Sequence, residues 1–225
     1  MKVKVCGITQ LEQLHALSEM AVDYAGFIFY PPSPRYVEKA GLLGADVKNA
    51  AVELRKVGVF VDASYDEVMH RIDEYGLDMV QLHGRETSYE CKRLAAHIDV
   101  IKAFRFSGDD HVGWMIKDYY ADTDFLLFDT GVPAPKGEHP EKAVYGGTGR
   151  KFDWSRLQEV AIQKPFFLSG GIAPGDAETI NAFMTTPAAK SMIAIDINSR
   201  FETAPGVKNL EQIKQFLGEL KQANG

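Results

Sequence analysis

The chain has 225 residues, of which 45% are hydrophobic and 25% are charged, as in an ordinary globular protein rather than a disordered or collagen-like one. Its 25 basic and 31 acidic side chains give a net charge of −6, so we expect no nucleic-acid partner. Cys6 and Cys91 are too few for a disulfide scaffold and favour a reducing compartment. Targeting segments, membrane-spanning runs and metal-binding spacings are missing from the sequence, which predicts a cytoplasmic protein with no membrane or metal partner.

Short β-rich runs recur along the chain at a mean spacing of about 27 residues, which leaves room for one helix and two loops each time. Several runs are continuously apolar, as expected of parallel strands that are covered on both faces. The predicted strands are Lys2–Cys6, Tyr24–Phe29, Lys56–Val61, Met79–Leu82, Val100–Phe104, Phe125–Asp129, Phe166–Ser169 and Ser191–Ile195.

Helical patterns occupy the segments between these runs. Thr9 is expected to cap the first helix, and Ser64 with Glu67 forms a capping-box pattern before the third. The second segment, 38–55, has the weakest pattern because Gly41 and Gly44 interrupt it. The other predicted helices are Gln10–Met20, Tyr65–Tyr75, Ser88–His97, Asp109–Tyr119, Asp153–Ile162, Gly175–Met184 and Asn209–Gln222.

This alternation of eight strands with helices predicts a single-domain (β/α)8 TIM barrel over residues 1–225. An open, doubly wound sheet is the alternative, but eight even units with no leftover domain favour a closed barrel. In such barrels the active site lies at the C-terminal ends of the strands.

Two reactive side chains come at predicted strand ends. Cys6 closes the first strand, and a thiolate at a barrel mouth can act as a base or nucleophile, although a free cysteine is most often a small buried hydrophobe. Asp129 ends an apolar strand, where a carboxyl group suits a general acid; the alternative is a turn aspartate that bonds to the backbone. Together, this base and acid can move two protons of one substrate.

Arg35 and His83 are candidates for contacts to a substrate. Arg35 lies in the proline-rich loop 31–36, which is stiff enough to hold its guanidinium ready for a carboxylate or phosphate. The alternative is a solvated arginine on a rigid surface turn. His83 follows the fourth strand and can either contact substrate or serve as a structural histidine.

Two glycine motifs indicate phosphate binding. Gly147 lies in the motif 146–149 before a predicted helix, and Gly170 and Gly171 follow the seventh strand. Glycine lets backbone N–H groups approach a phosphate closely, and barrels often bind phosphate after strands 7 and 8, although each motif alone also fits an ordinary tight turn. Neither has the pattern of a nucleotide-binding loop, so we expect a phosphorylated metabolite and no nucleotide cofactor.

The segment after the eighth strand adds three polar candidates. Asp196 can hold sugar hydroxyls, and Asn198 and Ser199 can help to bind phosphate. The alternative is a cluster of side chains that cap a turn and a helix.

Eight motifs carry a family resemblance: 5–9 (VCGIT), 26–29 with 33–36 (GFIF, SPRY), 57–61 (VGVFV), 81–84 (QLHG), 128–130 (FDT), 146–149 (GGTG), 169–172 (SGGI) and 205–208 (PGVK). In this order, and over nearly the whole chain, they resemble the phosphoribosylanthranilate isomerase family. The first two motifs together are the most specific.

The resemblance implies a cofactor-free enzyme of tryptophan biosynthesis that converts N-(5-phosphoribosyl)anthranilate into 1-(2-carboxyphenylamino)-1-deoxyribulose 5-phosphate. In that reaction Asp129 would be the general acid that opens the sugar ring, and Cys6 the base that removes the C2′ proton. Arg35 would pair with the anthranilate carboxylate, and the loops after strands 7 and 8 would bind the phosphate. The sequence is compatible with a monomer or a homodimer.

One position departs from the family pattern. The family usually reads Asp-x-Ser-Ser-Gly-x-Glu after the eighth strand, whereas segment 196–202 has Arg200 in place of the glycine. We hypothesise that the Arg200 side chain either compensates electrostatically or points to solvent.

Other phosphosugar barrels are the nearby alternatives. An indole-3-glycerol-phosphate synthase would need a catalytic lysine, for which Lys102 is a candidate, but Cys6 and Asp129 would then have no role. A histidine-pathway isomerase would typically have aspartates at the ends of strands 1 and 5, and Cys6 occupies the first of these positions. A barrel that only binds a phosphorylated ligand would not need the thiol.

Overall fold

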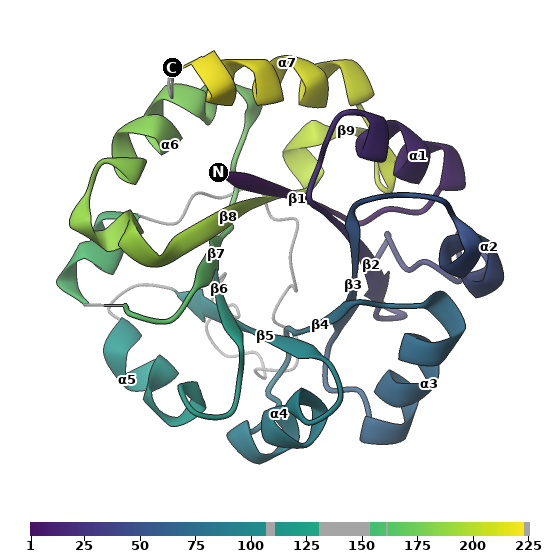
Figure 1. The fold of residues 1–225 in the computed structure, drawn as a ribbon, viewed down its shortest axis with the longest axis horizontal. Helices are drawn as coiled ribbons and strands as arrows, with labels where there is room; N and C mark the ends of the chain where they lie inside the picture. Colours follow the sequence, from purple (N-terminus) through teal and green to yellow (C-terminus); the bar gives the residue numbers. More distant parts are fainter. Residues whose placement is uncertain (107–110, 131–153, 161, 223–225) are drawn as a thin grey trace, which may run out of the picture.

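Eight parallel strands close into a barrel in the computed structural model, which describes residues 1–106, 111–130, 154–160 and 162–222. They pair in chain order, and β8 closes the ring against β1 (Figure 1). The predicted barrel is confirmed, and an open sheet is excluded. The strands are β1 (Lys2–Cys6), β2 (Tyr24–Phe29), β3 (Arg55–Phe60), β4 (Met79–Leu82), β5 (Asp99–Phe106), β6 (Phe125–Thr130), β7 (Phe166–Leu168) and β8 (Met192–Ile197).

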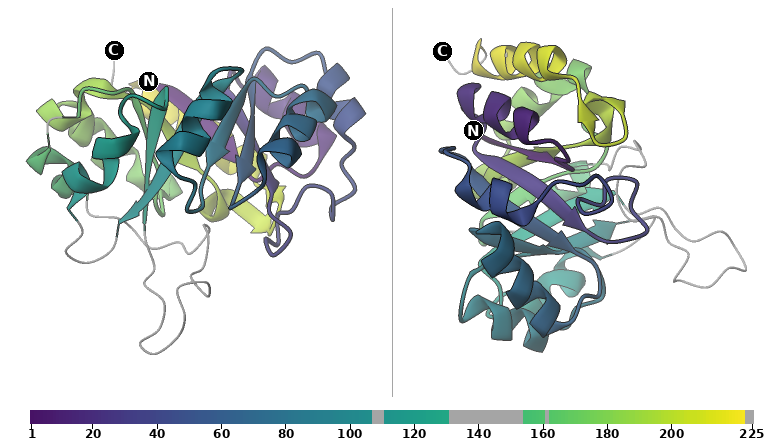
Figure 2. Two further views of the ribbon diagram at one scale, coloured as in Figure 1. Left: turned by 90° about the horizontal axis from the view of Figure 1, so that it is seen from below. Right: turned by 90° about the vertical axis from the view of Figure 1, so that its right-hand side faces the viewer.

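Helices surround the barrel (Figure 1). The α-helices are α1 (Leu11–Glu19), α2 (Gly44–Asn49), α3 (Tyr65–Tyr75), α4 (Ser88–Ala95), α5 (Val112–Ile116), α6 (Ala177–Met184) and α7 (Leu210–Gln222). Short 3-10 helices are η1 (Lys117–Tyr119), η3 (Trp154–Glu159), η4 (Pro174–Asp176), η5 (Pro187–Ser191) and η6 (Ser199–Phe201). A two-stranded ribbon of β9 (Glu202–Ala204) and β10 (Val207–Lys208) lies at the end of the barrel opposite Met1 (Figure 2). None of the helices in the described ranges is long and apolar enough to cross a membrane.

Of the two helix caps predicted from the sequence, one is present and the other is not. Ser64 accepts a hydrogen bond from the Glu67 backbone N–H and caps α3 as predicted. The predicted Thr9 cap is wrong, because its hydroxyl donates to the Gly206 carbonyl at 2.6 Å and α1 begins after Gln10 without a side-chain cap. This contact ties the start of α1 to the β9–β10 ribbon.

Two predicted helical segments contain little or no α-helix. Within segment 38–55 only α2 is α-helical, and it starts at Gly44, one of the two glycines that interrupt the pattern. The described part of Asp153–Ile162 forms η3, a 3-10 helix. Both segments are connections around the barrel, so the strand order is unaffected.

The barrel interior changes from apolar to polar along the strands. Its lower layer is a cluster of Tyr24, Val57, Met79, Ile101, Ala103, Leu127, Phe167 and Ala194. Because inward-facing residues alternate along a strand, the residue two positions further on each strand also points inward. On β6, β7 and β8 these residues are Asp129, Ser169 and Asp196, so the apolar layer supports a polar floor at the strand ends.

Candidate active site

A pocket opens at the C-terminal ends of the strands, where the barrel architecture predicts it. Arg35 does not line this pocket, and Gly147 lies outside the described residues. The other predicted site residues line it together: Cys6, His83, Asp129, Gly170, Gly171, Asp196, Asn198 and Ser199.

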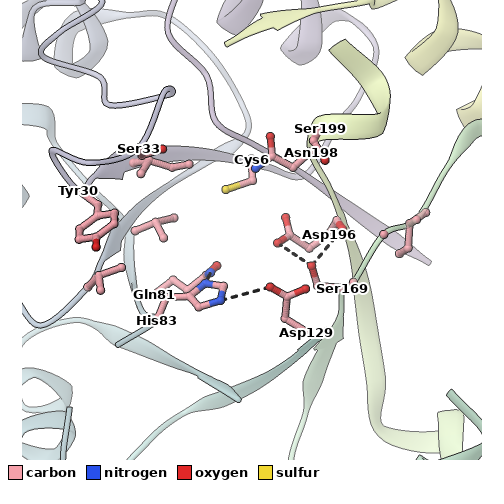
Figure 3. A pocket seen from close by; sticks show the side chains of 16 residues that line it. Cys6, Tyr30, Ser33, Gln81, His83, Asp129, Ser169, Asp196, Asn198 and Ser199 are labelled. Atoms are coloured by element: carbon pink, nitrogen blue, oxygen red, sulfur yellow. Dashed lines mark hydrogen bonds and ion pairs between the residues drawn. The ribbon is translucent and has the colours of Figure 1, made fainter. Parts of the chain in front are cut away.

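Cys6 and Asp129 approach the pocket from opposite sides. The Cys6 sulfur points into the open space, and Asp129 lies across it beside His83 (Figure 3). Gly26 on the neighbouring strand leaves room for the thiol, because a Cβ there would lie 2.8 Å from the Cys6 sulfur. The site therefore places a thiol and a carboxyl group around one volume.

The environment of Cys6 acts on its ionisation in two directions. Burial raises the pKa of the thiol, the Lys4 and Lys208 ammonium groups lower it, and the Asp196 carboxylate raises it. The net effect is a pKa above the ordinary value of a thiol. The two ammonium groups therefore act against the burial that disfavours a thiolate.

Asp129 and His83 form a contact within the pocket. Asp129 Oδ1 accepts a hydrogen bond from the Thr130 N–H at 2.7 Å, which fixes the carboxyl group. Its Oδ2 lies 3.3 Å from His83 Nε2, an ion-pair distance without hydrogen-bond alignment. Gln81 Nε2 lies 2.8 Å from His83 Nδ1, and an amide that donates there leaves the imidazole proton on Nε2, facing Asp129.

Arg35 is held beside the pocket by an ion pair instead of lining it. Its Nε and Nη2 donate to both carboxylate oxygens of Glu202 at 2.7–3.0 Å. Lys208 also donates to Glu202, at 2.6 Å, and to Asn198 Oδ1, at 2.8 Å. Burial alone would raise the pKa of Glu202, but the hydrogen bonds from Arg35 and Lys208 hold it below its ordinary value. Arg35 is thus preorganised by a partner that its own loop does not contain.

The two loops expected to bind phosphate both reach the pocket. Gly170 and Gly171 have φ angles of +95° and +70°, which L side chains rarely adopt, so the glycines are needed for this turn. Ser169, which precedes them, has its hydroxyl 3.4 Å from Asp196 Oδ2. Arg200 is exposed and does not line the pocket, in line with the hypothesis that its side chain points to solvent.

Lys102, the candidate lysine of a synthase, does not line the pocket. Its ammonium donates to the carbonyls of Leu82 and Gly84 and to the Glu86 carboxylate at 2.9–3.2 Å. It fixes the backbone on both sides of His83, which is a structural task.

Sequence reasoning missed several charged or polar residues of the site. Lys4, Gln81 and Ser169 lie on the inward face of their strands, so a polar residue at an alternating position was the available signal. Glu202 and Lys208 lie outside the barrel strands and gave no such signal; the family motifs at 196–202 and 205–208 include them, but not their contacts to Arg35 and Asn198, which form only once the chain is folded. Within the described ranges, no group of three His, Cys, Asp or Glu residues could hold a metal ion.

Fold and site together define an enzyme of the (β/α)8-barrel class, with a thiol and a carboxyl group in one pocket. Residues 3–219 match the family model of N-(5'-phosphoribosyl)anthranilate (PRA) isomerase. The chain belongs to this family.

Individual relatives agree with the family match. The chain is 34% identical to an N-(5'-phosphoribosyl)anthranilate isomerase of Parabacteroides distasonis over 98% of this chain and 93% of the relative. It is similar to the crystal structure of phosphoribosyl anthranilate isomerase from Thermus thermophilus, with a TM-score of 0.79, 29% identity and 99% coverage of both chains. A second structure, with a TM-score of 0.75, 28% identity and 99% coverage of both chains, is a phosphoribosyl anthranilate isomerase in complex with reduced 1-(o-carboxyphenylamino)-1-deoxyribulose 5-phosphate.

Proposed function

We propose that this chain converts N-(5-phosphoribosyl)anthranilate into 1-(2-carboxyphenylamino)-1-deoxyribulose 5-phosphate, a step of tryptophan biosynthesis. The observation that carries the proposal is the placement of Cys6 and Asp129 on opposite sides of one pocket, in a chain of this family. The reaction is an Amadori rearrangement, which needs one group to donate a proton and another to remove one.

Asp129 is the general acid in this proposal. Its protonated carboxyl group donates to the ring oxygen of the sugar, the bond from C1′ to that oxygen breaks, and the anthranilate nitrogen becomes a protonated imine. The Thr130 N–H holds Oδ1, so Oδ2, which faces the pocket beside His83, is the oxygen placed to donate. The protonated imine draws electrons from C1′ and acidifies the C2′ proton.

Cys6 is the base that completes the rearrangement. Its thiolate takes the C2′ proton, and the electron pair moves toward the imine to give an enolamine. Loss of the hydroxyl proton at C2′ and addition of a proton at C1′ then give the ketone. No electrons enter or leave, because one carbon is oxidised while its neighbour is reduced.

The substrate's charged ends have complementary partners around the pocket. The turn at Gly170 and Gly171 and the segment with Asn198 and Ser199 are proposed to bind the phosphate through backbone and side-chain donors. Arg35, which is anchored to Glu202 next to the pocket, is proposed to pair with the anthranilate carboxylate. Binding energy from both ends orients the reacting carbons.

The test is a fluorescence assay that follows loss of phosphoribosylanthranilate. Cys6→Ser and Asp129→Asn are expected to lower kcat by a factor of about 100 to 10,000, while circular dichroism and thermal unfolding stay close to those of the parent. Cys91→Ala, which removes the other thiol from a fully buried position, is the matched control and should keep parental turnover.

Two results would contradict the proposal in different ways. A parent protein that consumes no substrate would overturn the reaction itself. Full turnover in Cys6→Ser or Asp129→Asn would remove that residue from the mechanism while leaving the reaction in place.

Several expectations stay predictions. They are a single domain over residues 1–225, a place in the cytoplasm, the lack of a cofactor, and a monomeric or homodimeric state. The substrate contacts of Arg35, His83 and Asp196 also stay predictions.

A further inference from the structure

Lys4 is a fully buried lysine for which the proposed mechanism has no step. It lies on β1, two residues before Cys6, so both side chains point into the barrel interior. Its exposed fraction is 0%. A buried ammonium is costly unless it is paired, so its position beneath the pocket, on the same strand face as Cys6, calls for an explanation.

Asp196 orients the Lys4 ammonium. Lys4 and Asp196 are direct register partners where β8 closes the barrel against β1, and Nζ lies 2.9 Å from Oδ1. Burial lowers the pKa of Lys4, but Asp196 and Cys6 together keep it above its ordinary value, so the group stays charged. The cation is therefore fixed on the face of β1 that also carries the Cys6 sulfur.

The other charges around Cys6 come from several elements. Asp196 on β8 opposes ionisation of the thiol, and Lys208 on β10 favours it. Across the pocket lie Asp129 on β6 and His83 after β4. Of these groups, Lys4 has the largest effect in favour of the thiolate.

We propose that Lys4 is a positioning residue that stabilises the Cys6 thiolate while Asp196 holds the ammonium in place. The consequence for turnover rests on the proposed function, but the effect on the thiol does not. The alternative is that Lys4 only neutralises Asp196; the thiol would then be indifferent to its removal.

The experiment measures alkylation of Cys6, since only the thiolate reacts. In a Cys91→Ala background, the rate of iodoacetamide labelling of the Cys6 peptide is followed by mass spectrometry from about pH 6 to about pH 9. Lys4→Met is expected to label roughly tenfold more slowly than the background at the same pH, with the profile moved to higher pH. A profile that coincides with the background would overturn the proposal.

Two further variants keep the result interpretable. Lys4→Met leaves the Asp196 carboxylate buried without a partner, which destabilises the fold. The double variant Lys4→Met/Asp196→Asn removes both charges and is expected to be more stable than Lys4→Met. It should still label more slowly than the background, because the Lys4 effect on Cys6 exceeds that of Asp196. Lys56→Met removes a largely buried lysine on β3 that does not contact Cys6, and its Cys6 profile should stay at the background.

The alkylation assay contains no substrate, so it separates this inference from the proposed function. If Lys4→Met slows alkylation but the parent consumes no phosphoribosylanthranilate, the positioning role stands and the reaction is wrong. If the parent is active, the acid side of its kcat/KM profile should move to higher pH in Lys4→Met. An equal loss at every pH, with unchanged alkylation, would point to a structural role and contradict the proposal.

Discussion

Among the described residues, two of the buried lysine–carboxylate pairs have the same length and lie near a cysteine each. Lys4 and Asp196 are 2.9 Å apart; Asp196 lines the pocket, and Lys4 lies two residues before Cys6 on the same face of β1. Lys102 and Glu86 are also 2.9 Å apart, on the β4–β5 side, and act on Cys91. These two pairs therefore place the same chemistry beside each cysteine, one at the proposed reaction centre and one outside it.

The hydrogen-bond partners of the two pairs explain the difference. Glu86 accepts from the backbone N–H groups of Asp62 and Gly84, and Lys102 donates to two backbone carbonyls, so this pair is integrated into the loop that carries His83. Asp196 instead has one lysine and a long contact to Ser169, and it faces the pocket. A buried charge pair whose partners are mainly backbone stabilises a loop, whereas one that faces a cavity can act on a ligand or a reactive group.

Removing the lysine of the backbone-bound pair is expected to have the largest effect on stability. Lys102→Met leaves Glu86 buried with no cation and frees two carbonyls, which should cost about 3–5 kcal/mol of unfolding free energy. Urea unfolding monitored by circular dichroism measures it.

Two double variants test whether the backbone partners of Lys102 contribute to stability. Lys4→Met/Asp196→Asn should regain most of the stability that Lys4→Met loses, because no unpaired charge remains. Lys102→Met/Glu86→Gln should regain less, because the two carbonyls released by Lys102 stay unpaired. Equal recovery in both double variants would contradict the distinction drawn between the pairs.

A smaller loss of stability is expected when Gly7, the residue after Cys6, is replaced by alanine. Gly7 has φ of +78°, and a Cβ there would lie 2.8 Å from Arg35 Cδ and 2.9 Å from Asn198 Oδ1. Gly7→Ala should therefore cost about 2–3 kcal/mol. Gly41 is the matched control: its φ is +77° with nothing within 4 Å of a Cβ, so Gly41→Ala should cost only the backbone strain, about 1–2 kcal/mol.

The difference between these two glycine variants isolates the packing around Arg35. Gly7→Ala should also raise KM, since it displaces side chains at the rim of the pocket, and Gly41→Ala should leave KM unchanged. If both variants lose the same stability, Gly7 is needed for its backbone conformation alone.

Local chemistry made much of the fold predictable. The strand at Met79–Leu82 was predicted with the observed bounds because an apolar run that is buried on both faces has few other structures open to it. The Ser64 cap was predictable because its partner, the Glu67 N–H, is three residues away. Cys6 and Asp129 were found because barrels place their chemistry at strand ends.

The failures involve partners that are distant in sequence. Thr9 has the composition of a helix cap, yet its hydroxyl bonds to Gly206, 197 positions away. Arg35 was expected to be available for a substrate, whereas its guanidinium is already paired with Glu202, 167 positions away. The Lys4–Asp196 pair exists only because β8 closes against β1, which no local pattern specifies.

The smallest expected effect is on the pH dependence of stability, and it uses Cys91 to compare the two lysine pairs. Burial raises the pKa of Cys91 from 9.0 to about 12, even though Lys102 lowers it. Below pH 9 both the folded and the unfolded chain hold this proton, so its contribution to stability is fully present. Between pH 9 and about pH 12 only the unfolded chain releases it, and stability is lost as the pH rises.

The parent should therefore lose about 1 kcal/mol more than Cys91→Ala between pH 8 and pH 10, as measured by urea unfolding at each pH. Cys6 and Tyr75 also have raised pKa values, but they are present in both proteins and their contributions cancel. Identical pH dependence in the two proteins would mean that Lys102 stabilises the Cys91 thiolate as Lys4 is proposed to stabilise that of Cys6. The greater loss expected for the parent would show that a nearby lysine alone does not lower the pKa of a buried thiol, and it leaves the pocket and the backbone partners of the pair as the features that separate Cys6 from Cys91.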